Sequence, residues 1–269
     1  MILNKLNKFS ADLLEKRLGS EGFVCRNNLN WFKAVPDVLL CVQIRKNRGL
    51  AFDMTFGIIP FVCIKSLELN PGRFQPDAIY AREYRSELIR YYNELNGMQL
   101  EDRPRFLFSI DSTEKRLKDE RQYDVLLRYW GDVFDKIAAP FLFSVRDLES
   151  AVDAIGDFYK YRGRFDSEKR ALVFERAYTP DDMAAFMKLG KTQEAMKYWD
   201  GFIRAQVHSE QDMLELERKA EQARSEGKYT SVSLWYWLMK NDDKEGMEIV
   251  VSELEKHAYS WLAKNKIVI

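Results

Sequence analysis

Two histidines are the first side chains to consider for acid–base or metal chemistry, because an imidazole titrates near neutral pH and binds transition metals. His208 stands beside an expected helix start, and His257 falls within the expected last helix. Neither has a nucleophile or a second metal ligand at the spacing of a known catalytic motif. We therefore interpret both as structural or solvated side chains, and we expect no catalytic residue, no metal and no cofactor.

Signature motifs of the common enzyme classes are missing from the sequence. It contains no G-x-S-x-G nucleophile elbow, no Walker A loop, no G-x-G-x-x-G dinucleotide motif, no H-E-x-x-H zinc motif and no EF-hand loop. Two carboxylate pairs, Asp181-Asp182 and Asp242-Asp243, could in principle coordinate a cation. Both pairs stand at expected helix starts, where the helix dipole already favours negative charge, so we interpret them as structural.

One short run mixes basic and aromatic side chains in the way that single-stranded nucleic acid favours. It contains Tyr159, Tyr161, Arg162 and Arg164. Three carboxylates flank the run, those of Asp157, Asp166 and Glu168. Because no RNA-binding fold is recognisable around it, we favour the interpretation of a helix end followed by a surface loop, and keep nucleic-acid binding as the alternative.

The three cysteines, Cys25, Cys41 and Cys63, lie in expected strands or at their ends. Their odd number and the absence of C-x-x-C spacing suit neither a disulfide framework nor a zinc site. We expect buried free thiols, since a free cysteine behaves as a small hydrophobe.

The charge balance of the chain limits the classes of partner that we expect. Its 269 residues include 42 Lys and Arg against 42 Asp and Glu, which argues against a general nucleic-acid or membrane-surface role. Charged residues interrupt the leucines of Met1 to Leu18, so no signal peptide is expected. No later segment has the roughly 20 apolar residues that a membrane span needs. We therefore expect a cytoplasmic protein without a membrane partner.

The stretch from Gly22 to Cys63 predicts an antiparallel meander. Apolar residues alternate with others on both sides of the turn Asn47-Arg48-Gly49, which is typical of a β-hairpin. The other face of the hairpin carries Gln43, Arg45, Asp53 and Thr55, so one face can meet a core while the other meets water or a polar neighbour. Two earlier turns, at Asn27-Asn28 and at Val35-Pro36-Asp37, bring the number of strands to four.

Helices are expected on both sides of this meander. The leucine spacing predicts a first helix from about Leu3 to Leu18, with Gly19 as its C-terminal glycine cap. A tyrosine-rich helix is expected from Ala78 to near Gly97, and a fifth strand from Arg105 to Ile110. A further helix should start near Ser112 or Thr113 and stop at Pro140.

The second half of the sequence shows helix signals only. Capping residues at Ser144 (with Asp147), Thr179, Thr192, Ser209, Ser231 and Asp243 each predict a helix start. Gly190 and Gly227 mark two helix ends. The helix at 231–240 is apolar almost all round and should be buried. The last helix has its apolar stripe at Met247, Val250, Val251, Leu254, Ala258 and Trp261.

These elements predict an α+β protein. We expect an antiparallel sheet of about five strands covered by helices in residues 1–143, followed by an all-α helical-hairpin domain in residues 144–269.

The first 140 residues resemble an uncharacterised bacterial family catalogued as domain of unknown function 4304. The resemblance lies in the N-terminal helix, the run 18–23, the aromatic pair Trp31-Phe32, the strand 42–46 and the run 56–58. It implies a sheet framework but no functional residues, because the biochemistry of that family is unassigned. In the second half, the run 189–195 is similar to the turn of a tetratricopeptide-like hairpin, although no second copy follows at a fixed period.

Two functional hypotheses remain. The first is a non-enzymatic protein-interaction module whose partner is another protein, with sequestration of that partner, as by immunity and adaptor proteins, as one form of it. The helical hairpins and many aromatics motivate this hypothesis. The second is a nucleic-acid-associated factor or an enzyme whose site is assembled from dispersed charged side chains. A pocket lined by facing carboxylates, or by Arg and Lys with Tyr, would favour the second. The oligomeric state is not predicted.

Overall fold

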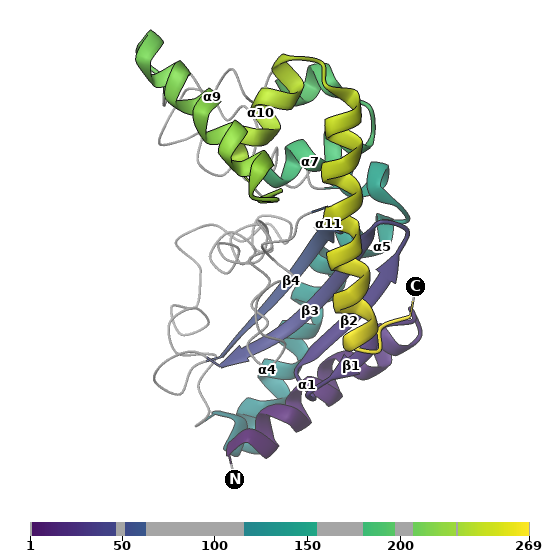
Figure 1. Cartoon of the computed structure of the whole chain (residues 1–269). Helices are drawn as coiled ribbons and strands as arrows, with labels where there is room; N and C mark the ends of the chain where they lie inside the picture. Colours follow the sequence, from purple (N-terminus) through teal and green to yellow (C-terminus); the bar gives the residue numbers. More distant parts are fainter. Residues whose placement is uncertain are drawn as a thin grey trace. The chain divides into compact units, whose positions relative to one another are not determined.

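The computed structural model describes residues 2–46, 52–62, 116–154, 180–196, 207–229 and 231–268 (Figure 1). Contacts divide these residues into two compact units. The first unit holds 2–46, 52–59, 116–154 and 267–268, and the second holds 60–62, 180–196, 207–229 and 231–266. The predicted boundary between 143 and 144 falls inside the first unit. The helical residues 148–154, which follow this boundary, belong to the same unit as residues 116–143.

Helix α1 (Ile2–Gly19) forms because its leucines and Phe9 recur every three or four residues. Its apolar stripe is fully buried and comprises Leu6, Phe9, Leu13, Leu14 and Leu18. The predicted cap at Gly19 is wrong, because Gly22 takes the left-handed conformation with a φ of 83°. The amide of Phe23 then donates to the Leu18 carbonyl and that of Gly22 to the Gly19 carbonyl, which is the Schellman pattern.

Four strands follow as an antiparallel meander in the order β1-β2-β3-β4. Their bounds are Val24–Arg26, Asn30–Val35, Val38–Lys46 and Phe52–Pro60. Asn27 and Asn28 both have positive φ, and Asp37 has a φ of 65°, so both predicted turns are confirmed. The predicted fifth strand at 105–110 lies outside the described residues, as do the turn at 47–49 and the helix at 78–97.

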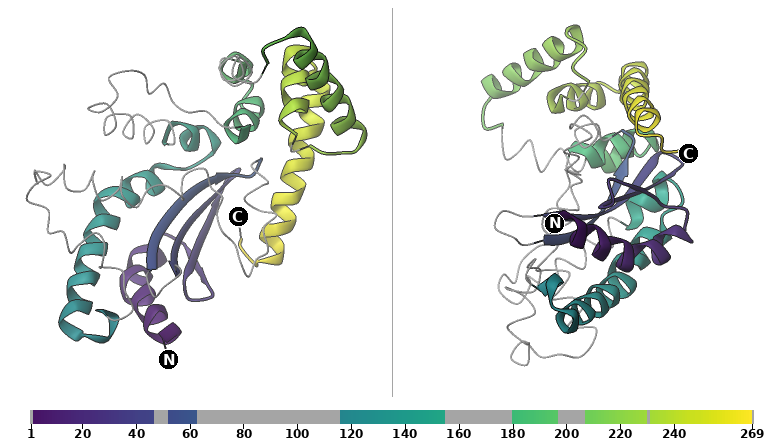
Figure 2. Two further views of the ribbon diagram at one scale, coloured as in Figure 1. Left: turned by 90° about the vertical axis from the view of Figure 1, so that its left-hand side faces the viewer. Right: turned by 90° about the horizontal axis from the view of Figure 1, so that it is seen from below.

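Strand β3 is buried on both of its faces. Residues on the face of Val42 are buried, and so are Leu39, Cys41 and Gln43 on the opposite face. Gln43, expected to meet water or a polar neighbour, is only 1% exposed, and its amide donates to the Asn30 Oδ1 at 2.7 Å. The face of Val42 also carries Trp31, whose indole donates to the Ser10 hydroxyl of α1. Helix α1 therefore covers this face, and α4 (Glu120–Val133) lies beside α1 (Figure 2).

The helix that begins at α4 does not stop at Pro140, contrary to the prediction. A 3-10 turn, η4 (Arg116–Lys118), precedes α4, and a π-helical turn, η5 (Phe134–Ala138), joins α4 to α5 (Ala139–Ser144). A proline ring in a regular helix clashes with the carbonyl four residues earlier. The π-helical turn ends at Ala138, and Pro140 stands in the first turn of α5, where a proline is tolerated because its missing N–H would lack a partner in a regular helix.

The predicted capping box at Ser144 is also displaced. Ser144 ends α5, and the next helical residues are 148–154. Asp147 caps them: its carboxylate accepts from the Ser150 amide at 2.8 Å, while the Ser150 hydroxyl accepts from the Asp147 amide at 3.0 Å. The hydrogen bonds that the Asp147 carboxylate accepts from the Ser150 amide and from the Ser150 hydroxyl lower the pKa of Asp147. The reciprocal box is therefore Asp147 with Ser150, three residues later than expected.

In the second unit, the predicted helices are confirmed where they are described. They are α7 (Pro180–Lys188), α9 (Glu210–Ser225), α10 (Val232–Lys240) and α11 (Lys244–Lys264). Ser209, Ser231 and Asp243 cap the last three of these helices through their side chains. Gly190 and Gly227 have the positive φ that ends a helix.

Helices α9 and α10 pack against each other as a hairpin (Figure 1). Most of α10 is buried, as its nearly uniform apolar sequence predicts. Residues 192–196 are helical again after Gly190, and Ala195 is fully buried, as the tetratricopeptide-like turn predicts. Beyond residue 62, the described part of the chain contains helices and turns without strands. Within the same ranges, no helix is both long and apolar enough to traverse a bilayer.

Candidate functional site

The structure gives partial answers about the residues singled out in the sequence. Tyr159, Tyr161, Arg162 and Arg164 lie outside the described residues, so nucleic-acid binding by this run stays a prediction. His208 and His257 are both exposed. In the ranges that the structure describes, no three His, Cys, Asp or Glu side chains gather as metal ligands would.

Two of the cysteines are described, and both are free thiols. Cys41 is buried in β3, and Cys25 is half-buried in β1, while Cys63 lies outside the described residues. Burial raises the pKa of Cys41 to about 12 and also raises that of Cys25. Both side chains are therefore protonated near neutral pH, which makes them poor nucleophiles.

The second unit contains a hollow of about 500 Å³ between α7 and α11. We call it the α7–α11 groove. Its lining residues are Met187, Lys188, Gly190, Thr192, Lys244, Met247, Glu248, Val251, Ser252 and Glu255. The six from α11 share one helix face, because they recur at intervals of three or four residues. The groove therefore follows α11 from Lys244 to Glu255, which is roughly 16 Å at 1.5 Å per residue.

Three apolar side chains of this groove, Met187, Met247 and Val251, are half-buried. The core of α11 lies on an adjacent face, where Val250 and Leu254 are 2% and 1% exposed. The sequence had placed Met247 and Val251 in one core stripe with Val250. A stripe wider than the core requires was the signal that this helix has a second apolar face.

The charged residues of the groove fall into two groups. Lys188 and Glu255 form an ion pair, with side chains 20% and 22% exposed. Lys244 and Glu248 are exposed, and neither has an ion pair among the described residues. The groove thus presents an apolar centre with one neutralised pair at one end and two available charges at the other.

The first unit contains a second hollow of about 530 Å³ between α1 and α4. We call it the α1–α4 hollow. Its lining residues are Lys5, Lys8, Asp12, Leu117, Lys118, Glu120, Tyr123, Asp124 and Leu127. Three lysines face three carboxylates around one tyrosine, which is the kind of pocket that would suit a dispersed charged site.

Tyr123 is the central polar group of this hollow. Its hydroxyl donates to the Asp12 Oδ2 at 2.5 Å, and the Lys8 ammonium lies 5.6 Å from its ring centroid. Burial raises the pKa of Tyr123, and the hydrogen bond to Asp12 raises it further. The phenol therefore stays protonated near neutral pH and holds its proton in the hydrogen bond to Asp12. Its ring also packs edge-on against Phe9, so the same residue joins α1 to α4.

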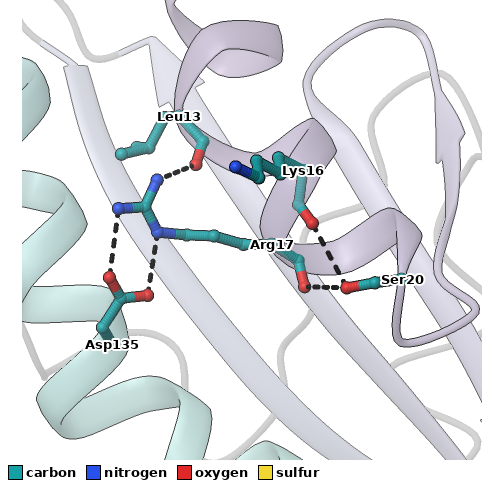
Figure 3. A network of polar contacts seen from close by, with 5 residues as sticks. All are labelled: Leu13, Lys16, Arg17, Ser20 and Asp135. Atoms are coloured by element: carbon teal, nitrogen blue, oxygen red, sulfur yellow. Dashed lines mark hydrogen bonds and ion pairs between the residues drawn. The ribbon is translucent and has the colours of Figure 1, made fainter.

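A second polar link joins α1 to η5, the π-helical turn that continues α4 (Figure 3). The Arg17 guanidinium donates to both carboxylate oxygens of Asp135, at 2.8 and 3.0 Å, and to the Leu13 carbonyl at 2.7 Å. Gly131 makes room for it, because a Cβ there would stand 2.5 Å from the Arg17 Nη2. The two links fix α1 against α4 and against η5, so a structural role accounts for much of the polar chemistry between these segments.

Comparisons with other proteins add no functional residue. Neither a family model, nor a curated protein, nor a solved structure matches this chain. The resemblance to domain of unknown function 4304 therefore stays a prediction.

Proposed function

We propose that this chain is a non-enzymatic, cytoplasmic protein-interaction module that binds another protein through the α7–α11 groove. Sequestration of that partner, as immunity and adaptor proteins do, is the form of the proposal that we favour. The observation that carries the proposal is the row of Met187, Met247 and Val251, which is apolar and half-buried beside a separate, fully buried core face.

Several properties of this row suit protein binding. Methionine side chains are unbranched and polarisable, so they adapt to different apolar partners. Burying a half-exposed apolar side chain contributes about 25 cal/mol for each Å² removed from water. The titratable groups among the described lining residues are Lys188, Lys244, Glu248 and Glu255, and two of these, Lys188 and Glu255, already neutralise each other. Helical scaffolds commonly bind partners in grooves of this kind.

Comparative capture from cells of the native host tests this proposal. Full-length chain carrying Val251→Lys places a charge in the groove, whereas Ser260→Lys places the same charge at an exposed position on the opposite side of α11. We expect wild type and Ser260→Lys to retain the same partner, and Val251→Lys to retain about tenfold less of it. Equal recovery by all three proteins would contradict the proposal, provided that their thermal melts agree.

The second candidate is an enzyme with a dispersed charged site, and the α1–α4 hollow favours it. Among the described residues that line this hollow, three lysines balance three carboxylates, which suits a small ligand carrying both signs better than a polyanion. A thermal-shift screen of amino acids and other zwitterionic metabolites tests this candidate. A shift that Lys118→Ala removes and Lys16→Ala leaves intact would support it. The absence of any such shift would leave the structural role of the hollow as its explanation.

A further inference from the structure

The lining of the α7–α11 groove limits the conformation of what can bind there. Strand addition requires an exposed sheet edge, but the walls of the groove are helices. Proline-rich peptides dock between aromatic rings, and phosphorylated motifs need arginine clusters. Among the described residues that line the groove there is no aromatic side chain and no arginine. Of the common recognition modes, a helix laid in an apolar groove is the one that fits.

The dimensions of the groove agree with this mode. Met247 and Val251 lie one turn apart on α11, and Met187 faces them from the last turn of α7. The run from Lys244 to Glu255 is about three helical turns long. A bound helix of that length presents apolar residues at i, i+3 or i+4, and i+7, which is enough to cover this row.

The charges of the groove add a direction to this fit. Glu255 and Lys188 neutralise each other at one end of the groove. At the other end, Lys244 and Glu248 stand one turn apart without an ion pair among the described residues. A bound segment that placed like charges beside these residues would be repelled, whereas opposite charges steer and orient it. The occupant should therefore carry an acidic residue near Lys244 and a basic residue near Glu248.

Resting on the proposed function, we propose that the partner protein inserts an amphipathic helix into the α7–α11 groove. Its apolar anchors cover Met187, Met247 and Val251, and an acidic and a basic residue flank those anchors to pair with Lys244 and Glu248. The Lys188–Glu255 pair bounds the groove at its far end. The charge pattern of the bound helix is thus the complement of two adjacent turns of α11.

A selection with displayed peptides tests this inference without knowledge of the partner. The library consists of 18-residue helical peptides in which the apolar positions vary among Leu, Ile, Met and Phe and the flanking positions vary between Glu and Lys. Matched libraries hold the same residues in alternating or proline-rich order. The full-length chain is the bait, as wild type, as Val251→Lys and as the double variant Lys244→Glu with Glu248→Lys.

We expect wild type to enrich helical peptides with one flanking order of Glu and Lys, and the double variant to enrich the reverse order. Each selected peptide should bind the other bait with about tenfold lower affinity, and the Val251→Lys variant should bind neither class of peptide. Enrichment of the alternating or proline-rich libraries, or of the same peptides by both charge variants, would overturn the inference. So would a failure of the helical library to yield any peptide that depends on Val251. If capture from cells still depended on Val251, the proposed function would stand while the helical partner would not.

Discussion

The position of the Arg17 side chain depends on the absence of a side chain at Gly131. The guanidinium that binds Asp135 occupies the space where a Cβ of residue 131 would stand. Its side chain is 31% exposed and that of Asp135 is 50% exposed, so solvent weakens the ion pair, although its bidentate geometry is favourable. A glycine inside a helix lowers its stability relative to alanine, and at position 131 the missing Cβ leaves the space that the Arg17 guanidinium occupies.

A double-mutant cycle tests this dependence. In an Arg17→Ala background, Gly131→Ala should raise the free energy of unfolding by about 0.5–1 kcal/mol, because alanine is the better helix former. In the wild-type background the same substitution displaces the guanidinium, so its effect should be less favourable by about 1 kcal/mol. Urea unfolding measures both effects. Arg128→Ala on the exposed face of α4 is the control background, and equal effects of Gly131→Ala in all three backgrounds would contradict the contact.

The cysteines provide a test that depends on pH. The folded pKa of Cys41 is about 12, against 9.0 for an unburied thiol, because burial disfavours the thiolate. The stability that the buried thiol contributes is fully present below pH 9 and is lost as the pH rises from about 9 towards about 12. Iodoacetamide at pH 8 should therefore modify the half-buried Cys25 well before Cys41, with Cys41 reacting only in urea. Peptide mass spectrometry resolves the two sites, and similar rates in the native protein would refute this account.

At the scale of the elements, α10 and α11 approach each other closely at Gly246. A Cβ at this position would stand 2.5 Å from the Leu238 Cδ2 and 2.7 Å from the Asp243 Oδ2. The Asp243 carboxylate caps α11 by accepting from the Gly246 amide at 2.9 Å, and it also accepts from Arg224 at 3.2 Å. A substitution at Gly246 therefore disturbs the packing of Leu238 and the helix cap together.

We expect Gly246→Ala to lower the free energy of unfolding by about 1–3 kcal/mol, because overpacking outweighs the gain in helix propensity. Ser260→Ala, at an exposed position of the same helix, should change it by no more than about 0.5 kcal/mol. Chemical unfolding followed by circular dichroism compares the two variants. Greater stability of the Gly246→Ala protein would show that α10 and α11 do not approach as described.

The element boundaries that the sequence predicts well are those with one local cause. Asn27 and Asn28 tolerate positive φ, and the side chain of Ser209 caps α9 directly. A window of a few residues is therefore enough to identify both the turn and the helix start. Gly22 was missed in favour of Gly19 because the Schellman motif also needs the apolar pair of Leu18 and Phe23, both of which are buried. The continuation of the helical segment through Pro140 could not be predicted, since a π-helical turn has no local sequence signal.

At the scale of the molecule, the fold class follows from the order of periodicities along the chain. The alternation between Gly22 and Cys63 and the helix signals after Ser144 predict an antiparallel sheet followed by a helical second half, and the described residues confirm this fold class. The groove does not follow in the same way, because Met187 and Met247 come from helices that are distant in sequence. In the sequence, only the excess width of the apolar stripe on α11 indicated the groove. A stripe on one helix does not identify which other helix forms the opposite wall.

Site-specific photo-crosslinking in cells of the native host tests the central claim most directly. A photoreactive phenylalanine analogue replaces Val251 in the groove or, as the control, Ser260 on the opposite side of α11. We predict a discrete adduct with a second polypeptide from position 251 and none from position 260. The absence of an adduct at 251, or the same set of adducts at both positions, would contradict the claim that the α7–α11 groove binds a protein partner.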